Sequence, residues 1–325
     1  MHFRDIITIG NYMFDIPILY LVFNRLDTVQ RTLPVLQELK PAQLFIAADG
    51  PRKTKAGEAE MCQKVRDYVT SNINWDCKVQ TLFRDENLGC QKNVSAAITW
   101  FFENVEMGIV LEDDCLPDMT FFPYCRELLY RYKDDPRVMH IAGDNPLQSS
   151  KLKNNESYYF EKIQHCWGWA NWARSWKYFN LEVGDEYKDL IKTNNYFKNK
   201  RVREDWINIF EGLKAHKIDS WAYVWSYKVL QNNGLCINPR NNLVQNIGMD
   251  SGIHFTGTNN ESDGRPAIPM EFPLVHPKKI DFNYKQIRKL QQIGKDEFIL
   301  IRFIKAVLKK LGIFYTLKKL IKGHI

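Results

Sequence analysis

The sequence lacks the close cysteine spacing of metal-binding and disulfide-rich proteins. Its seven cysteines are an odd number, and no two of them form a Cys-x-x-Cys pair. Neither a zinc framework nor a disulfide framework is therefore indicated, and a reducing cytoplasm is the simplest setting. No run is apolar for the ~20 residues of a membrane span, and residues 1–15 lack the apolar core of a signal peptide.

Excess charge is also missing from the body of the chain. The net charge is +7, but residues 298–325 contain seven basic residues and no acid, so residues 1–297 hold 38 basic and 38 acidic residues. A nucleic-acid binder needs a basic surface on its folded body, so we expect no nucleic-acid partner. Hydrophobic residues make up 45% of the chain, which is enough for a large core.

The basic segment has the pattern of an amphipathic helix. Apolar Leu300, Ile304, Val307 and Leu311 recur at helical spacing, and lysines occupy the other faces. Helices of this type commonly lie on anionic membrane surfaces. The alternative is a helix packed on the domain with its lysines in water. We expect a cytoplasmic protein that is peripheral on the inner face of the membrane.

Short apolar runs alternate with helical patterns in the N-terminal third. Short, wholly apolar strands are typical of parallel sheets that are buried on both faces. The alternation predicts an α/β fold with a mainly parallel sheet and helices on both faces. The apolar runs are Ile16–Phe23, Leu44–Ala48, Val79–Phe83 and Gly108–Leu111, and the helical patterns are Thr28–Leu39, Glu58–Val69 and Asn93–Asn104.

Polar side chains follow all four apolar runs. In open α/β sheets, ligands bind beyond the carboxyl ends of the strands. We therefore expect these polar residues to line one binding edge. They are Asn24 and Arg25, Asp49, Arg84 and Asp85, and Glu112–Asp114.

The acidic run Glu112–Asp114 is the most informative of these groups. Three adjacent carboxylates repel one another beside an apolar strand, and a divalent cation removes that repulsion. Mg²⁺ and Mn²⁺ prefer oxygen ligands, usually one or two carboxylates plus substrate phosphates. A diphosphate leaving group needs such charge neutralisation. The alternative is a solvated acidic turn that caps a helix near Pro117–Tyr132.

The acidic run stands within a longer series of motifs. In order, these are Pro17–Arg25, Asp49-Gly50, Arg84–Cys90, Ala97-Ile98, Trp100–Phe102, Gly108–Asp114, Pro117-Asp118, Phe121-Phe122, Ile218–Ala222, Asn238-Pro239, Asn242–Val244, Asn246–Gly248 and Ser251–His254. The series resembles the GT-A glycosyltransferases, which use nucleotide-diphospho-sugars. It is similar in particular to the N-acetylglucosaminyltransferase I branch and to bacterial enzymes of surface-polysaccharide assembly. The resemblance covers about residues 16–257.

The resemblance implies a Rossmann-like GT-A domain over residues 1–270. Its nucleotide-binding half would be residues 16–145 and its acceptor half residues 146–257, with a basic helical tail over 271–325. It further implies a Mn²⁺ or Mg²⁺ cofactor and an inverting transfer from a nucleotide-diphosphate sugar, with UDP-sugars favoured. The acceptor would be a glycan or a lipid-linked glycan of the cell surface.

Individual roles follow from the same resemblance. Asp114 would bind the metal, Asp113 would lie near the ribose or the donor sugar, and Glu112 would hold the neighbourhood in place. Arg84 would approach the nucleotide or its phosphates, although an ion pair with a nearby acid is the alternative. The other nucleotide-binding residues would be Asn24 and Arg25 in the pocket wall and Asp49 at a uracil-type base.

An inverting transfer also needs a carboxylate that takes the proton from the acceptor hydroxyl. The resemblance leaves two candidates, Asp219 in Ile-Asp-Ser-Trp-Ala and Asp205 in Glu-Asp-Trp, and favours Asp219. Asp219 could instead cap the helix through Trp225. Relatives often carry an Asp where this chain has Ala222, which leaves the identity of the base open.

Two further features have open interpretations. His254 resembles a late histidine that some members bring to the metal or diphosphate, but a lone histidine is more often an ordinary polar residue. The aromatic residues Trp167, Trp169 and Trp172 either wall the acceptor site or fill the core.

Two other functions compete with a glycosyltransferase. A sugar nucleotidyltransferase would carry a glycine-rich loop with a basic residue after the first strand, where this chain has Asn24–Asp27 and no glycine. An inactive, membrane-associated nucleotide-binding scaffold on the same fold would not need the intact acidic run. Both features favour the glycosyltransferase.

Overall fold

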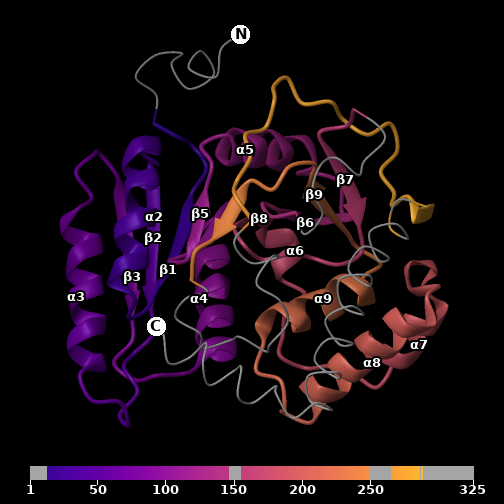
Figure 1. Ribbon diagram of the computed structural model, residues 1–325, viewed down its shortest axis with the longest axis horizontal. Helices are drawn as coiled ribbons and strands as arrows, with labels where there is room; N and C mark the ends of the chain where they lie inside the picture. The colour runs from indigo at the N-terminus through magenta and orange to yellow at the C-terminus, as the bar shows by residue number, and fades with distance from the viewer. Residues whose placement is uncertain (1–12, 146–154, 249–264, 286, 288–325) are drawn as a thin grey trace, which may run out of the picture.

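The computed structural model describes residues 13–145, 155–248, 265–285 and 287. These residues form an eight-stranded mixed sheet with helices on both faces, together with a two-stranded ribbon (Figure 1). The α/β architecture predicted from the alternation of strands and helices is confirmed. The basic segment 298–325 lies outside the described residues.

The strands of the sheet are arranged in the order β3-β2-β1-β4-β8-β6-β9-β7. Parallel pairing joins β3, β2, β1 and β4, and it also joins β6 to β9. Strand β8 is antiparallel to both β4 and β6, so β4 and β6 point the same way. The bounds are β1 Ile18–Val22, β2 Gln43–Ala48, β3 Lys78–Phe83, β4 Met107–Glu112, β6 Val138–Ala142, β7 Tyr158–Glu161, β8 Trp169–Trp172 and β9 Leu235–Pro239.

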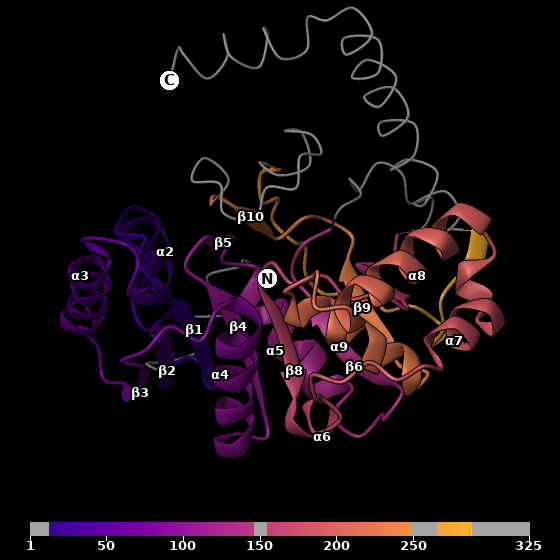
Figure 2. The same cartoon turned by 90° about the horizontal axis from the view of Figure 1, so that it is seen from below.

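Helices cover both faces of the sheet because side chains alternate along the buried strands. In β1, Ile18, Tyr20 and Val22 face one cluster, while Leu19 and Leu21 face another. The first cluster includes α2 (Leu26–Leu39), α3 (Glu58–Ser71) and α5 (Phe121–Arg131); the second includes α4 (Cys90–Asn104), α6 (Ala173–Trp176) and α9 (Trp221–Gln231). An outer layer contains α7 (Tyr187–Thr193), the short turn η2 (Asn195–Phe197) and α8 (Lys200–Lys214), packed on α9 (Figure 2).

The tryptophans of the second half belong largely to this core. Trp169 has an exposed fraction of 0% and Trp172 of 2%, whereas Trp167 is half-buried. The first two lie in β8 between β4 and β6, and Trp169 packs against Trp176 and Trp221. Trp169 and Trp172 therefore fill the core and do not wall a binding site.

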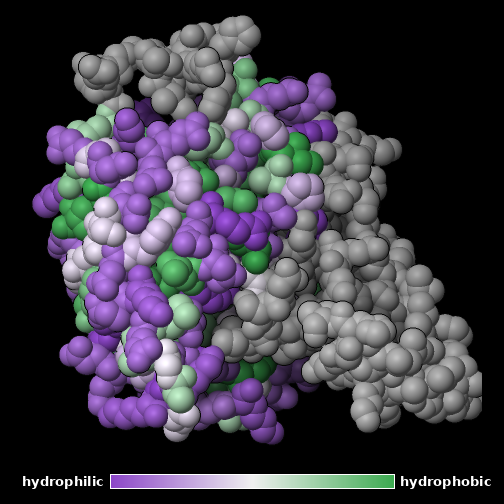
Figure 3. Space-filling model, turned by 60° about the vertical axis from the view of Figure 1, so that its left-hand side comes forward, coloured by the Kyte–Doolittle hydropathy of each residue, from purple (hydrophilic) through white to green (hydrophobic). Residues whose placement is uncertain are grey.

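Strand β3 differs from the sequence prediction of burial on both faces. It is one of the two edge strands of this sheet, and its Lys78 and Val79 are exposed. Because β3 pairs only with β2, its outer side meets water, and Lys78 helps to keep that edge from pairing with other chains. The flank that carries α2 and α3 is accordingly mostly polar, with small scattered apolar areas (Figure 3).

All seven cysteines are free thiols, in agreement with the absence of a disulfide framework. In the part of the chain that the structure describes, no helix combines the length and apolarity required to cross a bilayer.

Candidate active site

The carboxyl ends of β1, β2, β3 and β4 meet at one edge of the sheet, since these strands are parallel neighbours. This edge carries the polar residues that follow each strand: Asn24 and Arg25, Asp49, Arg84 and Asp85, and Asp113 and Asp114 after Glu112 at the end of β4. The prediction that these residues share one edge of the sheet is therefore confirmed by the topology, and ligand binding at that edge stays a prediction.

Arg25 holds two carboxylates of the acidic run. Its guanidinium donates to Asp113 Oδ1, and its Nη1 lies 3.0 Å from Asp114 Oδ2. Asp113 is nearly buried, and its Oδ2 also accepts a hydrogen bond of 3.3 Å from the backbone of Phe23. The backbone N–H of Asp113 in turn donates to Leu21 at 2.9 Å. The β1 and β4 strand ends are thereby fastened to each other through both main chain and charge.

The single positive charge of Arg25 does not neutralise all three carboxyl groups of the acidic run. Burial raises the pKa of Glu112, and the charges of Asp114 and Asp113 raise it further, while Arg25 lowers it. Burial also raises the pKa of Asp113, against the influence of Arg25. One guanidinium thus faces three carboxyl groups, and a second cation at this edge would relieve the remaining repulsion.

A two-stranded ribbon closes one side of the acidic run. Strand β5 (Cys115–Pro117) pairs with β10 (Val244–Asn246), and the N–H of Ile247 donates to the carbonyl of Asp114 at 2.8 Å. This pairing brings Gly248 onto the ion pair. A Cβ atom at Gly248 would come within 2.6 Å of Arg25 Nη1 and closer still to Asp114 Oδ2, so only glycine leaves room for both side chains.

The residues present fit a divalent cation that is completed by a substrate. Asp114 offers a carboxylate whose side chain is 16% exposed. Mg²⁺ and Mn²⁺ are commonly bound by one or two carboxylates, with substrate phosphates and water as the other ligands. Among the residues that the structure describes, no three or more His, Cys, Asp or Glu side chains converge as a metal cage. A cation at Asp114 would therefore take its other ligands from substrate phosphate oxygens and from water.

Asp49 anchors the loop that follows β3. Its two oxygens accept hydrogen bonds from the N–H groups of Gly50 (2.9 Å), Leu88 (2.9 Å) and Gly89 (3.1 Å) and from Asn87 Nδ2 (3.0 Å). The loop and the end of β2 pack so closely that a Cβ at Gly50 would clash with the backbone of Glu86. Asp49 therefore fixes the shape of this part of the binding edge.

Asn24 and Arg84 lie on the same edge with partners of their own. Asn24 Nδ2 donates to Glu58 Oε1 at 2.8 Å, and Arg84 Nε donates to Asn93 Oδ1 at 3.1 Å. The ion pair considered for Arg84 is not formed within the described ranges. Both side chains are half-buried, so each has a fixed position and an accessible surface.

The structure separates the two candidates for the general base. Asp219 is exposed and lies at the loop after β3, with its Oδ2 3.9 Å from where a Cβ of Gly89 would stand. Burial raises the pKa of Cys90 to about 12, with contributions from Glu112 and Asp219, so Cys90 lies near both. Asp205 is exposed on α8, in the outer layer of helices. Asp219 thus lies beside the loop after β3, on the side of the acidic run, whereas Asp205 lies in the outer helical layer; the identity of the base stays a prediction.

Helix capping gives the same answer for Asp219. The N-cap of α9 is Ser220, whose side chain accepts from the N–H of Tyr223. Asp219 is therefore not the capping residue, and its carboxylate is available at the binding edge. The acidic run is likewise not a helix cap, because α5 begins after Thr120 and Asp118 accepts from the N–H and hydroxyl of Thr120.

Sequence reasoning missed Asp144, which follows β6 at the same edge. Asp144 is 4% exposed, accepts from the N–H of Trp167 at 3.1 Å, and lies 4.0 Å from His165 Nδ1. Burial opposes the charged form of His165, but the carboxylates of Glu161 and Asp144 outweigh it and raise the pKa. The apolar run Val138–Ala142 followed by Gly143-Asp144 is the signal that was available. His254 lies outside the described residues.

Comparisons with known proteins gave distant structural similarities alone. No protein-family model and no curated protein matches the chain. The apo form of mouse xyloside xylosyltransferase 1 is similar at 10% identity, over 66% of this chain and 81% of its own, with a TM-score of 0.34. HddC from Yersinia pseudotuberculosis is similar at 11% identity, over 49% of this chain and 77% of its own, with a TM-score of 0.30. At this distance neither similarity assigns an activity to this chain.

Proposed function

We propose that the chain is a metal-dependent glycosyltransferase. It would move a sugar from a nucleotide-diphosphate donor, with UDP-sugars favoured, to a glycan or lipid-linked acceptor in cell-surface polysaccharide assembly. The observation that carries this proposal is the pairing of Arg25 with Asp113 and Asp114 at the carboxyl edge of the sheet, with Asp219 beside the loop that follows β3 at the same edge. That edge is where open α/β sheets bind ligands.

The donor half of the edge suits a nucleoside diphosphate. Asp114 would hold Mn²⁺ or Mg²⁺ together with the diphosphate, and the bound cation would supply charge neutralisation to the leaving group. Arg25 adds a fixed positive charge beside the same oxygens. Asn24 and Arg84 offer accessible polar surface near the nucleotide, and Asp49 shapes the pocket through the loop after β3.

The acceptor half of the edge offers one exposed carboxylate. Asp219 would accept the proton of the acceptor hydroxyl as its oxygen attacks the anomeric carbon, which is general-base catalysis. Asp219 is exposed, so an acceptor hydroxyl can reach its carboxylate. The inverting outcome and a His254 contribution to the metal come from the family resemblance alone.

The cell-surface setting is proposed from the sequence of the basic segment. An amphipathic basic helix would hold the enzyme at the cytoplasmic face of the membrane, beside a lipid-linked acceptor. A sugar nucleotidyltransferase is disfavoured because this chain has no glycine-rich loop after the first strand. Residues 24–27 are Asn-Arg-Leu-Asp. The other alternative is a scaffold protein without catalytic activity.

Thermal unfolding with nucleoside diphosphates tests the proposal. UDP, GDP and dTDP are each added with and without Mn²⁺ to the wild type, to Asp114→Ala and to Asp134→Ala, whose side chain is 88% exposed. A ligand at 100 times its Kd stabilises the folded state by about 2.7 kcal/mol. We expect metal-dependent stabilisation by one nucleotide, lost in Asp114→Ala and retained in Asp134→Ala. A protein without a metal-dependent nucleotide site would show none, and an inactive scaffold that binds nucleotide would show stabilisation but release no nucleoside diphosphate from a donor.

A further inference from the structure

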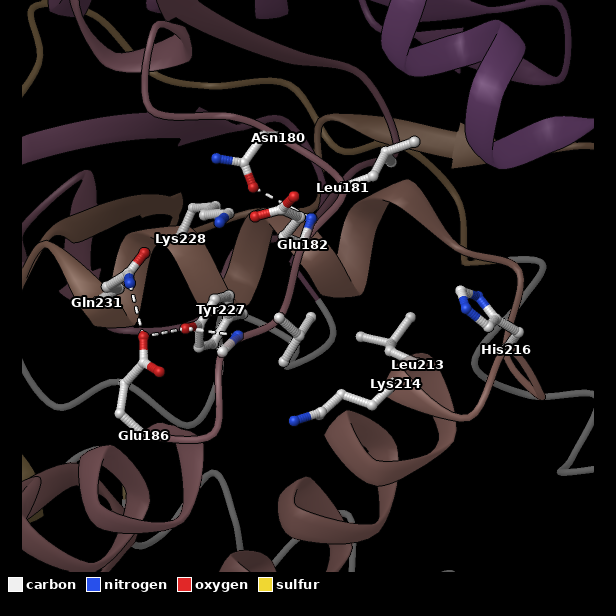
Figure 4. A pocket seen from close by; sticks show the side chains of 12 residues that line it. Asn180, Leu181, Glu182, Glu186, Leu213, Lys214, His216, Tyr227, Lys228 and Gln231 are labelled. Carbon is white, nitrogen blue, oxygen red and sulfur yellow. Dashed lines mark hydrogen bonds between the residues drawn. The ribbon is translucent and has the colours of Figure 1, made fainter.

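A cavity lies beside the C-terminal half of α9, apart from the acidic run. It has a volume of about 600 Å³ and is formed by residues 180–186, the end of α8 and the second half of α9 (Figure 4). Helix α9 begins at Trp221, beside Asp219, and ends at Gln231, so its two ends are ~15 Å apart at 1.5 Å per residue. Small-ligand pockets commonly measure 300–1,000 Å³. The cavity is large enough for a ligand and separate from the proposed donor site.

Lys228 is the buried cation of this cavity. The residue is 4% exposed, and burial lowers its pKa, against the raising influence of Glu182 and Glu186. Its ammonium lies 5.1 Å from the Tyr227 ring centroid, and no hydrogen bond or ion pair to it is formed in the described part of the chain. The Nζ atom is not among the fully buried polar atoms that lack a partner, so the ammonium reaches the surface of the cavity, where an oxygen of a ligand can accept from it.

Glu186 contributes a carboxylate, a hydrogen-bond acceptor, to the same cavity. The Tyr227 hydroxyl and Gln231 Nε2 (2.7 Å) both donate to Glu186 Oε1, which fixes the carboxylate (Figure 4). Glu182 lies nearby, with its backbone N–H held by Asn180 Oδ1 at 3.1 Å. The carboxylates of Glu182 and Glu186 therefore line the cavity together with the ammonium of Lys228.

The charges of the cavity limit the class of ligand. Lys214 is already paired with Asp185 outside the lining, so Lys228 is the lysine of the lining that stands against Glu182 and Glu186. An anion would meet the repulsion of the two glutamates. A neutral polyhydroxyl ligand can accept from Lys228 and donate to the carboxylates at once. The exposed side chain of Leu181 adds an apolar patch for the carbon–hydrogen face of a sugar ring.

We infer that this cavity is a saccharide-binding site for a neutral sugar unit, distinct from the proposed active site. Lys228 donates to a sugar oxygen, and Glu182 and Glu186 accept from sugar hydroxyls. Occupation of the cavity does not require the proposed transferase activity, because neither Asp114 nor Arg25 belongs to its lining.

Saturation-transfer NMR tests this site on the full chain. The probes are the methyl glycosides of glucose, galactose, mannose and N-acetylglucosamine, with glucuronic acid as the anionic comparison. The test variants are Lys228→Met and Glu186→Gln. The matched control is Lys177→Met, because Lys177 also lies 5.1 Å from a tyrosine ring but is exposed and outside the cavity. Thermal unfolding of each variant confirms that it is folded.

We expect at least one neutral glycoside to bind the wild type, and Lys228→Met to weaken that binding about ten- to hundredfold. Lys177→Met and Asp114→Ala should bind it as the wild type does, and Lys228→Met should keep any stabilisation by UDP. The inference is overturned by the absence of binding from every neutral glycoside, by stronger binding of glucuronic acid, or by loss of binding in Asp114→Ala with retention in Lys228→Met.

Discussion

Nη1 of Arg25 lies 3.0 Å from Oδ2 of Asp114, and the same guanidinium binds the almost fully buried Asp113. One residue from the end of β1 thus stabilises the two carboxylates that follow β4. The pair explains how the fold tolerates an acidic run at the end of an apolar strand. It also makes Arg25 important for stability and not only for ligand binding.

Arg25→Gln should therefore destabilise the protein by about 3 kcal/mol, because it leaves a buried carboxylate without its partner. Denaturant unfolding in the absence of divalent metal measures this loss. Lys53→Gln is the comparison, since Lys53 pairs with Glu86 on the surface, where both side chains are at least 70% exposed. That exposed pair should contribute far less, because water and salt screen its two charges. Equal losses in the two variants would show that the Arg25 pair is not structural.

The two candidate bases should respond differently to removal of their charge. Asp219→Asn should lower transfer about 10²- to 10⁴-fold with little change in nucleotide binding, since a general base acts on the acceptor proton. Asp205→Asn should leave transfer unchanged, because Asp205 is exposed on the outer helix α8. Steady-state rates with saturating donor give the comparison. A larger loss in Asp205→Asn would move the base to that residue.

The first half of the fold could be predicted from the sequence because its signals are local. The apolar runs that end before Asn24, Asp49, Arg84 and Glu112 correspond to β1–β4, and their parallel order places those residues on one edge. The exposure of β3 was not predictable, because the residues of a strand do not indicate whether it lies in the middle or at the edge of a sheet. Edge position depends on which other strands find partners.

The second half of the fold contains contacts that no local sequence pattern predicts. Strand β8 pairs antiparallel between β4 and β6, which buries Trp169 and Trp172 in the core. Gly248 reaches Asp114 only through the β5–β10 ribbon, across more than a hundred residues of sequence. The choice between Asp219 and Asp205 likewise depends on where α9 begins relative to Gly89. Such long-range contacts follow from the complete packing and not from spacing along the chain.

Asp49 should stabilise the protein mainly through the hydrogen bonds by which it holds the loop after β3. Asp49→Asn places an amide N–H₂ against donors from Gly50, Leu88 and Gly89, which leaves donors unpaired. We expect a loss of about 1–3 kcal/mol of unfolding free energy by denaturant titration. Unchanged stability combined with an altered preference among UDP, GDP and dTDP would assign Asp49 to the nucleobase instead.

His140 should make the protein less stable in weak acid. It is buried with its Nε2 2.8 Å from the His165 carbonyl and its Nδ1 3.3 Å from Trp225 Nε1, an arrangement that needs the neutral ring. Burial lowers its pKa from 6.5 to about 3. Between these values the unfolded chain binds the extra proton, so stability is complete above pH 6.5 and falls as the pH drops toward 3.

The resulting loss from His140 between pH 7 and pH 5 is about 2 kcal/mol. Other groups titrate in the same range, so the measurement is the difference between wild type and His140→Gln in denaturant unfolding at both pH values. The wild type should lose more stability than the variant on acidification. An identical pH dependence in the two proteins would mean that His140 accepts its proton in the folded state.

Release of nucleoside diphosphate from a panel of UDP-, GDP- and dTDP-sugars, with Mn²⁺ or Mg²⁺, tests the central claim most directly. Wild type, Asp114→Ala and Asp134→Ala are compared, each with and without EDTA. The proposed function predicts slow release from one class of donor in the wild type and in Asp134→Ala, abolished by EDTA and by Asp114→Ala. Release that persists in Asp114→Ala, or no release and no nucleotide binding with any donor, would contradict it.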